Sequence, residues 1–248
     1  MKILAGPLAG MEIFMGPAVT RAYVLGVYEV AVTKALEALC KPGMVACDIG
    51  AHQGYFTLLL ARLVGPDGRV YAFEPMPGNY HSLERTLRIN HLNNVVQAIP
   101  LAVAQESGDV LFQYSDKATS TGNIVHAGND STNLTSERKR VALRAVSLDD
   151  YAQEVGIQRI DLIKMDIEGE ELNALRGMQW VLSRMRPVIV CEVHGKPIGR
   201  DPGAVLQFLL DLGYALHDIV DDQHPMVNPD GFTGGHVLGV CGNTVGDE

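Results

Sequence analysis

Residues 45–54 read VACDIGAHQG, and this stretch decides the fold. Its first half is a short apolar run of the kind that forms a buried strand. Its second half is a turn that contains Gly50 and Gly54, which let the backbone approach a ligand closely. Residues 54–64 are apolar on nearly every side and predict a central helix. A strand, a glycine turn and a helix in this order are typical of a parallel α/β sheet.

The same alternation of short apolar runs and longer periodic segments continues along the chain. It predicts further strands at 69–73, 95–99, 160–165, 187–193, 214–220 and 236–241, and helices from Pro77, over 171–185 and over 202–212. The stretch from 109 to 140 is less regular. Residues 110–114 alternate like an exposed strand, and 115–138 indicate a long polar loop, which is a candidate substrate lid. The fold class is therefore α/β with a mostly parallel sheet.

The composition predicts one globular domain with additions. The chain has 248 residues, of which 47% are hydrophobic and 20% charged. Twenty Lys and Arg against 29 Asp and Glu give a net charge of −9, which opposes binding to a phosphodiester backbone. The basic run at 138–140 is short. We therefore expect no nucleic acid partner.

The distribution of cysteines and apolar residues predicts a cytoplasmic protein. The four cysteines form no C-x-x-C pair, and Cys47 and Cys191 lie inside strand-like runs, as reduced thiols do. The N-terminus is interrupted by Pro7 and Gly10 and carries Glu12, which argues against a signal peptide. No apolar stretch reaches the roughly 18 residues that a membrane span needs.

The turn after residue 49 favours a nucleoside without phosphates. Dinucleotide-binding turns follow G-x-G-x-x-G and hold a pyrophosphate. Asp48 replaces the first glycine here, and its carboxylate would repel phosphate but could attract a cationic ligand or anchor the turn. Glu74 ends the next predicted strand, twenty residues after Gly54, where this topology places an acid against ribose hydroxyls. Together these two acids favour S-adenosylmethionine.

Acids and a histidine follow two later strands. Asp166 and Glu168 come after the strand at 160–165, whereas Glu192 and His194 close the strand at 187–193 and point to one side of it. Ligands bind beyond the carboxyl ends of such strands. Methyl transfer to a hydroxyl requires removal of one proton, and an imidazole has an ordinary pKa of about 6.5. His194 is thus the candidate base.

Two alternatives compete with that role. Asp166, Glu192 and His194 could instead bind a divalent cation, Mg²⁺ or Mn²⁺, that lowers the pKa of the hydroxyl. In the second alternative the role is structural: His194 bonds a loop and Glu192 caps a helix. Glu170 and Glu171 are interpreted as complementing a helix dipole, and Lys164, within a strand, is expected to pair with a nearby acid.

Four strings carry a family resemblance: VACDIGAHQGYFTLLLA, VYAFEP, LIKMDIEGEELNALRGM and RPVIVCEVH. In order and spacing they resemble the FkbM-type family of S-adenosylmethionine-dependent methyltransferases, from about Tyr28 to His194. The resemblance implies a class I methyltransferase fold: a seven-stranded sheet with one antiparallel strand and helices on both faces. It also implies O-methylation of a hydroxyl on a sugar, glycolipid or polyketide. The family usually has Asn and an aliphatic residue where this chain has His52 and Gln53.

The motifs and the resemblance together define the expected site. Glu29 matches a position where the family often has Glu and is a candidate for the aminoacyl end of the cofactor. The catalytic candidates are His194, Asp166 and Glu192. The expected cofactor site comprises Glu29, Asp48, Gly50, His52, Gly54, Tyr55, Glu74, Pro75 and Asp166. For Tyr55, packing within the helix is the competing interpretation.

The expected organisation is an N-terminal cap or helical extension (1–40) and a class I methyltransferase domain (41–248) with an inserted hairpin or lid (109–140). The first 26 residues are candidates for a cap over the site or a contact in a homo-oligomer. The expected partner is a small-molecule or glycan acceptor. A nicotinamide-dependent oxidoreductase and a non-catalytic nucleoside-binding module are the alternative functions, the former disfavoured by Asp48.

Overall fold

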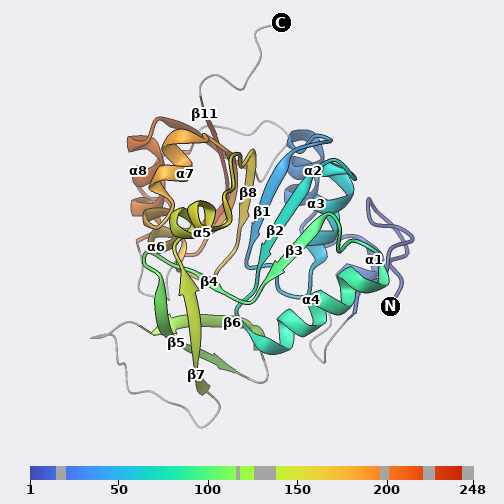
Figure 1. Cartoon of the computed structure of the whole chain (residues 1–248). Coiled ribbons are helices and arrows are strands. Elements are labelled where there is room, and N and C mark those ends of the chain that lie inside the picture. The colour runs from blue at the N-terminus through green and yellow to red at the C-terminus, as the bar shows by residue number, and fades with distance from the viewer. Residues whose placement is uncertain (15–20, 116–117, 126–137, 196–200, 220–226, 242–248) are drawn as a thin grey trace, which may run out of the picture.

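The computed structural model describes residues 1–14, 21–115, 118–125, 138–195, 201–219 and 227–241. Its centre is a seven-stranded sheet in the order β10-β11-β9-β8-β1-β2-β3, in which β11 runs antiparallel to both neighbours and the other pairings are parallel (Figure 1). This confirms the expected fold. The strands are β1 (Val45–Ile49), β2 (Arg69–Phe73), β3 (Val96–Ile99), β8 (Leu162–Met165), β9 (Val188–Val193), β10 (Tyr214–Asp218) and β11 (Gly235–Cys241).

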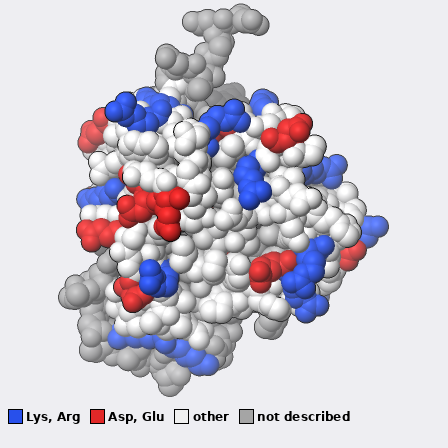
Figure 2. Space-filling view, in the orientation of Figure 1, with Lys and Arg blue, Asp and Glu red and all other residues white. Residues whose placement is uncertain are grey.

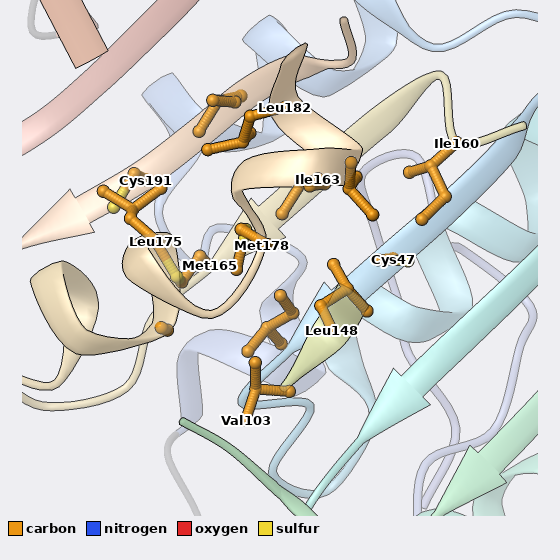
Figure 3. Packing of buried hydrophobic residues seen from close by; sticks show 14 of the residues in the cluster. Cys47, Val103, Leu148, Ile160, Ile163, Met165, Leu175, Met178, Leu182 and Cys191 are labelled. Carbon is orange, nitrogen blue, oxygen red and sulfur yellow. The ribbon is translucent and has the colours of Figure 1, made fainter. Parts of the chain in front are cut away.

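Helices cover both faces of the sheet because alternate strand residues point to opposite sides. Cys47, Ile163 and Cys191 pack against one group of helices, α5 (Leu148–Val155), α6 (Glu171–Arg176), α7 (Gln179–Arg184) and α8 (Pro202–Asp211) (Figure 3). Ala46 and Leu162 pack on the other face with residues of α1 (Arg21–Leu25), α2 (Val30–Leu39), α3 (Tyr55–Val64) and α4 (Pro77–Ile89). The strands are therefore buried on both sides.

The single helix expected over 171–185 is wrong, because the chain forms α6 and then α7. Gly177 separates them at a point of close backbone contact: a Cβ on this residue would lie 2.1 Å from the carbonyl oxygen of Ala104. The side chain of Asp149 then accepts hydrogen bonds from the N–H groups of Trp180 and Val181, both at 2.9 Å. The break therefore depends on tertiary contacts.

A second sheet lies beside the first, in the order β4-β7-β5-β6. Its strands are β4 (Ala102–Val103), β5 (Gly108–Ser115), β6 (Ala118–Val125) and β7 (Arg138–Val146). The polar loop expected over 115–138 is wrong at 118–125, where β6 pairs antiparallel with β5. Phe112 and Ile124 are register partners and both are buried. Residues 116–117 and 126–137, and the lid expected there, lie outside the described residues.

Two features can be compared with the expected partners: the length and hydrophobicity of the helices, and the distribution of charge on the surface. Among the described helices, none is long and apolar enough to cross a lipid bilayer. On the face shown in Figure 2, basic side chains gather over the small sheet, where β7 carries Lys139, Arg140 and Arg144, and the rest of the face is mainly uncharged with separate acidic and basic groups.

Candidate active site

A cavity of about 300 Å³ opens at the carboxyl edge of β1, β2, β8 and β9. Ligands of parallel α/β sheets bind at this edge. Phe112 and Ile124 of the small sheet and Tyr23 and Tyr28 of the N-terminal segment also line it. Most of the predicted site residues line this cavity, namely Glu29, Gly50, His52, Tyr55, Glu74, Pro75, Asp166, Glu192 and His194. Asp48 and Gly54 are not among the lining residues.

The turn after β1 is closely packed against the end of β8. Gly50 has φ +85°, and a Cβ on it would lie 1.9 Å from the carbonyl oxygen of Asp166. The N–H groups of Gly50 and Ala51 donate to the carbonyl oxygen of Phe73, at 3.0 and 2.9 Å. Gly54 has φ +96° and begins α3, where a Cβ would meet the side chain of Leu83 at 2.7 Å. Gly50 thus forms the cavity wall, and Gly54 allows two helices to approach.

Asp48 lies behind the turn and is fully buried. Its Oδ2 accepts a hydrogen bond from the hydroxyl of Thr57 at 2.6 Å, and its Oδ1 lies 3.9 Å from Nζ of Lys164. Burial raises the pKa of Asp48, and Lys164 opposes that rise. These contacts favour the anchoring role of Asp48 over direct contact with a cationic ligand. They also confirm that Lys164 pairs with nearby acids, since its Nζ is 3.5 Å from Asp166 Oδ2.

Glu74 is a buried carboxylate at the tip of β2. Its Oε2 accepts the backbone N–H of His52 at 2.8 Å, and its Oε1 accepts that of Met76 at 2.9 Å. Burial raises the pKa of Glu74 to about 7, although these hydrogen bonds oppose the rise. Oε1 also accepts a hydrogen bond from the side-chain amide of Asn79 at 3.4 Å, which occupies its second lone pair, whereas Oε2 keeps capacity to accept from a ligand hydroxyl.

Two cavity-lining residues each carry a buried polar atom that has no hydrogen-bond partner among the described residues, namely His52 Nε2 and the Tyr55 hydroxyl. Burial lowers the pKa of His52, which keeps the imidazole neutral at neutral pH. Buried polar groups are nearly always hydrogen-bonded, so two such groups in one cavity indicate a place for a polar ligand.

The N-terminal segment closes the cavity on the side of α3. The rings of Tyr23 and Tyr55 stack with centroids 4.8 Å apart, and Tyr28 meets Tyr55 edge-on at 5.4 Å. Glu29 follows in a left-handed conformation, φ +39°, and its Oε2 lies 3.5 Å from Nε2 of His236 on β11. This places the Glu29 carboxylate at the cavity, beside aromatic faces that suit a cation.

His194 lies among four carboxylates. Its Nδ1 is 2.8 Å from Glu171 Oε1, and its Nε2 is 3.5 Å from Glu168, 3.6 Å from Glu192 and 3.9 Å from Asp166. Burial lowers the pKa of His194, but the hydrogen bond to Glu171 and the surrounding negative charge outweigh it and raise the pKa to about 9. The sequence-predicted catalytic residues Asp166, Glu192 and His194 are therefore close neighbours.

Three residues of this cluster were not among the predicted site residues, although Glu168 was noted as following its strand. Glu171 bonds the imidazole of His194 instead of serving only the dipole of α6. Glu168 has φ +54°, and burial raises its pKa to about 7. His236 is the register partner of Glu192 on β11 and lies 3.5 Å from its Oε2. The D-x-E-G-x-E spacing at 166–171 was the available signal for Glu171 and Glu168. The position of His236 could not be read from spacing, because it results from the antiparallel pairing of β11 with β9.

The cluster could also accommodate a cation. Asp166, Glu192 and His194 each offer one ligand atom within 4.8 Å of the others, and Glu29, Glu192 and His236 do the same. Carboxylate oxygens with one imidazole suit Mg²⁺ or Mn²⁺, although oxygen-rich sets are more usual for these ions.

Solved structures share the fold at low sequence identity. A protein from Clostridium thermocellum that is named as an rRNA-methylase superposes with a TM-score of 0.52 and 14% identity, covering 84% of this chain and 90% of that one. The cofactor-bound crystal structure of Rv0187 from MTB superposes with a TM-score of 0.51 and 17% identity, covering 92% and 83%. At this low sequence identity, the two superpositions show a shared fold and nothing more.

Three relatives are methyltransferases by name. The 31-O-demethyl-FK506 methyltransferase FkbM of Streptomyces tacrolimicus is 27% identical, covering 75% of this chain and 77% of that protein. The hexuronic acid methyltransferase AglP of Haloferax volcanii is 27% identical, covering 66% of this chain and 61% of that protein. Methyltransferase 1 of Beauveria bassiana is 26% identical, covering 60% of this chain and 65% of that protein. The chain thus spans less than two thirds of the last two.

Residues 48–216, well over half of the chain, match the methyltransferase FkbM domain. The matched region contains the turn after β1, Glu74, and the whole cluster around His194 except His236. The chain therefore belongs to the FkbM methyltransferase family.

Proposed function

We propose that this protein transfers the methyl group of S-adenosylmethionine to a hydroxyl of a sugar, glycolipid or polyketide-type small molecule. The observation that carries the proposal is that Glu74 and His194 line one cavity from the ends of β2 and β9. The first is a buried acceptor for ribose hydroxyls, and the second is a base for an acceptor hydroxyl. Family membership favours this reaction over the oxidoreductase alternative.

The cavity fits S-adenosylmethionine in its donors and acceptors. The Glu74 carboxylate would accept from the ribose hydroxyls, and the backbone of Gly50 to His52 would support the nucleoside. The unpaired His52 Nε2 and Tyr55 hydroxyl supply polar contacts, and Glu29 would hold the aminoacyl ammonium. When bound, the cofactor supplies an electrophilic methyl group on a sulfonium.

His194 is assigned as the base, acting through Nε2. The surrounding carboxylates raise the pKa of His194 to about 9, so the imidazole of the protein alone is mostly protonated at neutral pH. The positive charge of the bound cofactor would lower the pKa of His194, because it repels the charged imidazolium. Glu192 and Asp166 flank Nε2 and stabilise the imidazolium that forms when the hydroxyl proton is taken. Methyl transfer also requires that the reacting groups be aligned and that water be excluded, and the side chains that line the cavity would do both with substrates bound.

The acceptor class is proposed from the relatives and the wall chemistry. The names of FkbM and AglP refer to a 31-O-demethyl compound and to a hexuronic acid. Near His194 the cavity is lined by carboxylates, which accept hydrogen bonds from polyol hydroxyls. A flat aromatic acceptor would leave these groups unpaired.

A metal-assisted form of the same reaction is the second candidate. The grouping of Asp166, Glu192 and His194 within 4.8 Å favours it. In that form the three side chains would bind Mg²⁺ or Mn²⁺, and His194 would not act as the base.

Calorimetry and a transfer assay test the proposal. S-adenosylhomocysteine should bind with a micromolar or lower Kd and NADH should not bind; the reverse result would remove the assignment. Radiolabelled S-adenosylmethionine should then label hydroxylated acceptors in a panel of glycans, glycolipids and macrolide-like alcohols. Binding without transfer to any acceptor would favour a non-catalytic nucleoside-binding module.

A further inference from the structure

We propose that Glu171 is the positioning residue of His194 and fixes which ring nitrogen receives the acceptor proton. The role of His194 as base rests on the proposed function, but the contact itself does not. Glu171 Oε1 lies 2.8 Å from Nδ1, whereas Nε2 faces the side of the ring where Glu168 and Glu192 lie. The two nitrogens are therefore in different environments.

Glu171 is held more firmly than a solvent-exposed acid would be. It is 2% exposed, and its Oε1 also accepts the N–H of Gly169 at 2.8 Å. Glu168 and Gly169 both adopt left-handed conformations, φ +54° and +95°, which turn the chain back toward Glu171. A non-glycine residue in this region is strained and persists where its surroundings fix it. The turn thus presents the carboxylate to His194 from one fixed direction.

The chemistry of the pair determines the tautomer. An ionised carboxylate only accepts hydrogen bonds, so the proton of the neutral imidazole must be on Nδ1. The lone pair is then on Nε2, the nitrogen that faces the cavity. The hydrogen bond at one ring nitrogen sets the protonation of the other. His194 can accept a proton from an acceptor hydroxyl only in this tautomer.

Nuclear magnetic resonance of ¹⁵N-labelled protein without cofactor tests the contact independently of activity. Spectra are recorded above the pKa of His194, about 9, with the signal identified by its loss in His194→Asn. The wild type should show the Nδ1–H tautomer with a downfield Nδ1 proton. Glu171→Gln should move that proton upfield, because a neutral amide oxygen replaces a charged acceptor. Glu171→Ala should give a mixture of tautomers.

Kinetics then separate positioning from stability. Glu171→Ala should lower kcat by about 100-fold, the loss expected from a misplaced catalytic group, with cofactor Kd and acceptor KM within about twofold. Glu171→Gln should recover to within about tenfold of the wild type. Glu170→Gln is the matched control: it removes the charge of a neighbouring buried carboxylate that also lines the cavity but bonds Asn173, and the His194 tautomer should not change.

A wild-type spectrum with the proton on Nε2, or without a downfield Nδ1 proton, overturns the proposal even if Glu171→Ala does not fold. Wild-type kcat in a folded Glu171→Ala protein also overturns it. Failure of the wild type to methylate any acceptor would instead count against the proposed function, while the spectra would still decide the contact.

Discussion

The carboxylate of Glu74 accepts the backbone N–H of His52 at 2.8 Å, which joins the tip of β2 to the turn after β1. One side chain thus shapes the floor of the cavity and offers acceptors to a ligand. Its replacement should therefore affect both binding and the pH dependence of folding, and the two effects can be measured separately.

Glu74→Ala should weaken binding of S-adenosylhomocysteine by about 1–3 kcal/mol through the loss of charged hydrogen bonds. Isothermal titration calorimetry gives the change directly. Circular dichroism of the same samples controls for loss of fold. An unchanged Kd would show that the ribose binds elsewhere.

Glu74 should also make the free energy of unfolding decrease as pH rises from about 4.5 to 7. Its pKa is raised to about 7 by burial, so the folded protein binds more protons than the unfolded protein in this window. This contribution is fully present below pH 4.5 and is lost through pH 7, with a size of up to about 3 kcal/mol. Urea unfolding of the wild type and Glu74→Gln across the window should show the difference in slope. Parallel curves would contradict it.

Gly50→Ala should destabilise the protein by more than about 4 kcal/mol or prevent folding. The added Cβ would lie 1.9 Å from the Asp166 carbonyl oxygen, at φ +85°. Gly43→Ala is the matched control, because Gly43 has φ +80° and nothing within 4 Å of its Cβ. Its cost should be only the backbone conformational penalty, about 1–2 kcal/mol. Equal decreases in the free energy of unfolding for Gly50→Ala and Gly43→Ala, measured by urea unfolding, would exclude a steric role for Gly50.

His194→Ala should lower kcat by about 10²- to 10⁴-fold, the range typical of a lost general base. Cofactor affinity should stay within about twofold, because the contacts assigned to the cofactor are made by other residues. Single-turnover assays with saturating donor, beside calorimetry, measure the two quantities. A matched loss of binding and turnover would indicate that His194 holds the cofactor.

Chelation distinguishes the two forms of the reaction. With His194 as base, EDTA should leave kcat unchanged, and added Mg²⁺ should have no effect. Loss of activity with EDTA and its recovery with Mg²⁺ or Mn²⁺ would assign Asp166, Glu192 and His194 to a metal instead.

The main sheet could be predicted because its strands are buried on both faces and their sequences are mostly apolar, with one charged residue in some strands. Residues 45–49 and 162–165 are examples. β6 was not predictable in the same way, because its sequence ATSTGNIV is mostly small and polar and its pairing with β5 is a tertiary contact. The break at Gly177 likewise depends on Ala104, which is distant in sequence.

The site was predictable where residues follow strand ends, as Glu74, Asp166 and His194 do. Contacts across elements were not. Asp48 was expected either to attract a cationic ligand or to anchor the turn, and its bond to Thr57, behind the turn, favours the second role. Glu171 was interpreted through its helix, although its carboxylate bonds His194, 23 residues away. Residue type and spacing indicate which side chains have suitable chemistry for binding or proton transfer, and tertiary packing decides which of them are in contact.

The Glu192 carboxylate is shared between two imidazoles, with Oε1 3.6 Å from His194 and Oε2 3.5 Å from His236. His236 in turn contacts Glu29, whose carboxylate lies within 4.8 Å of that of Glu192. A charge that arrives near Glu29 should therefore alter the electrostatic balance at His194 through His236 and Glu192. Thermodynamic linkage makes this reciprocal: the methyl donor and the acceptor should change each other's affinity by the same factor, and Glu192 is the group that couples them.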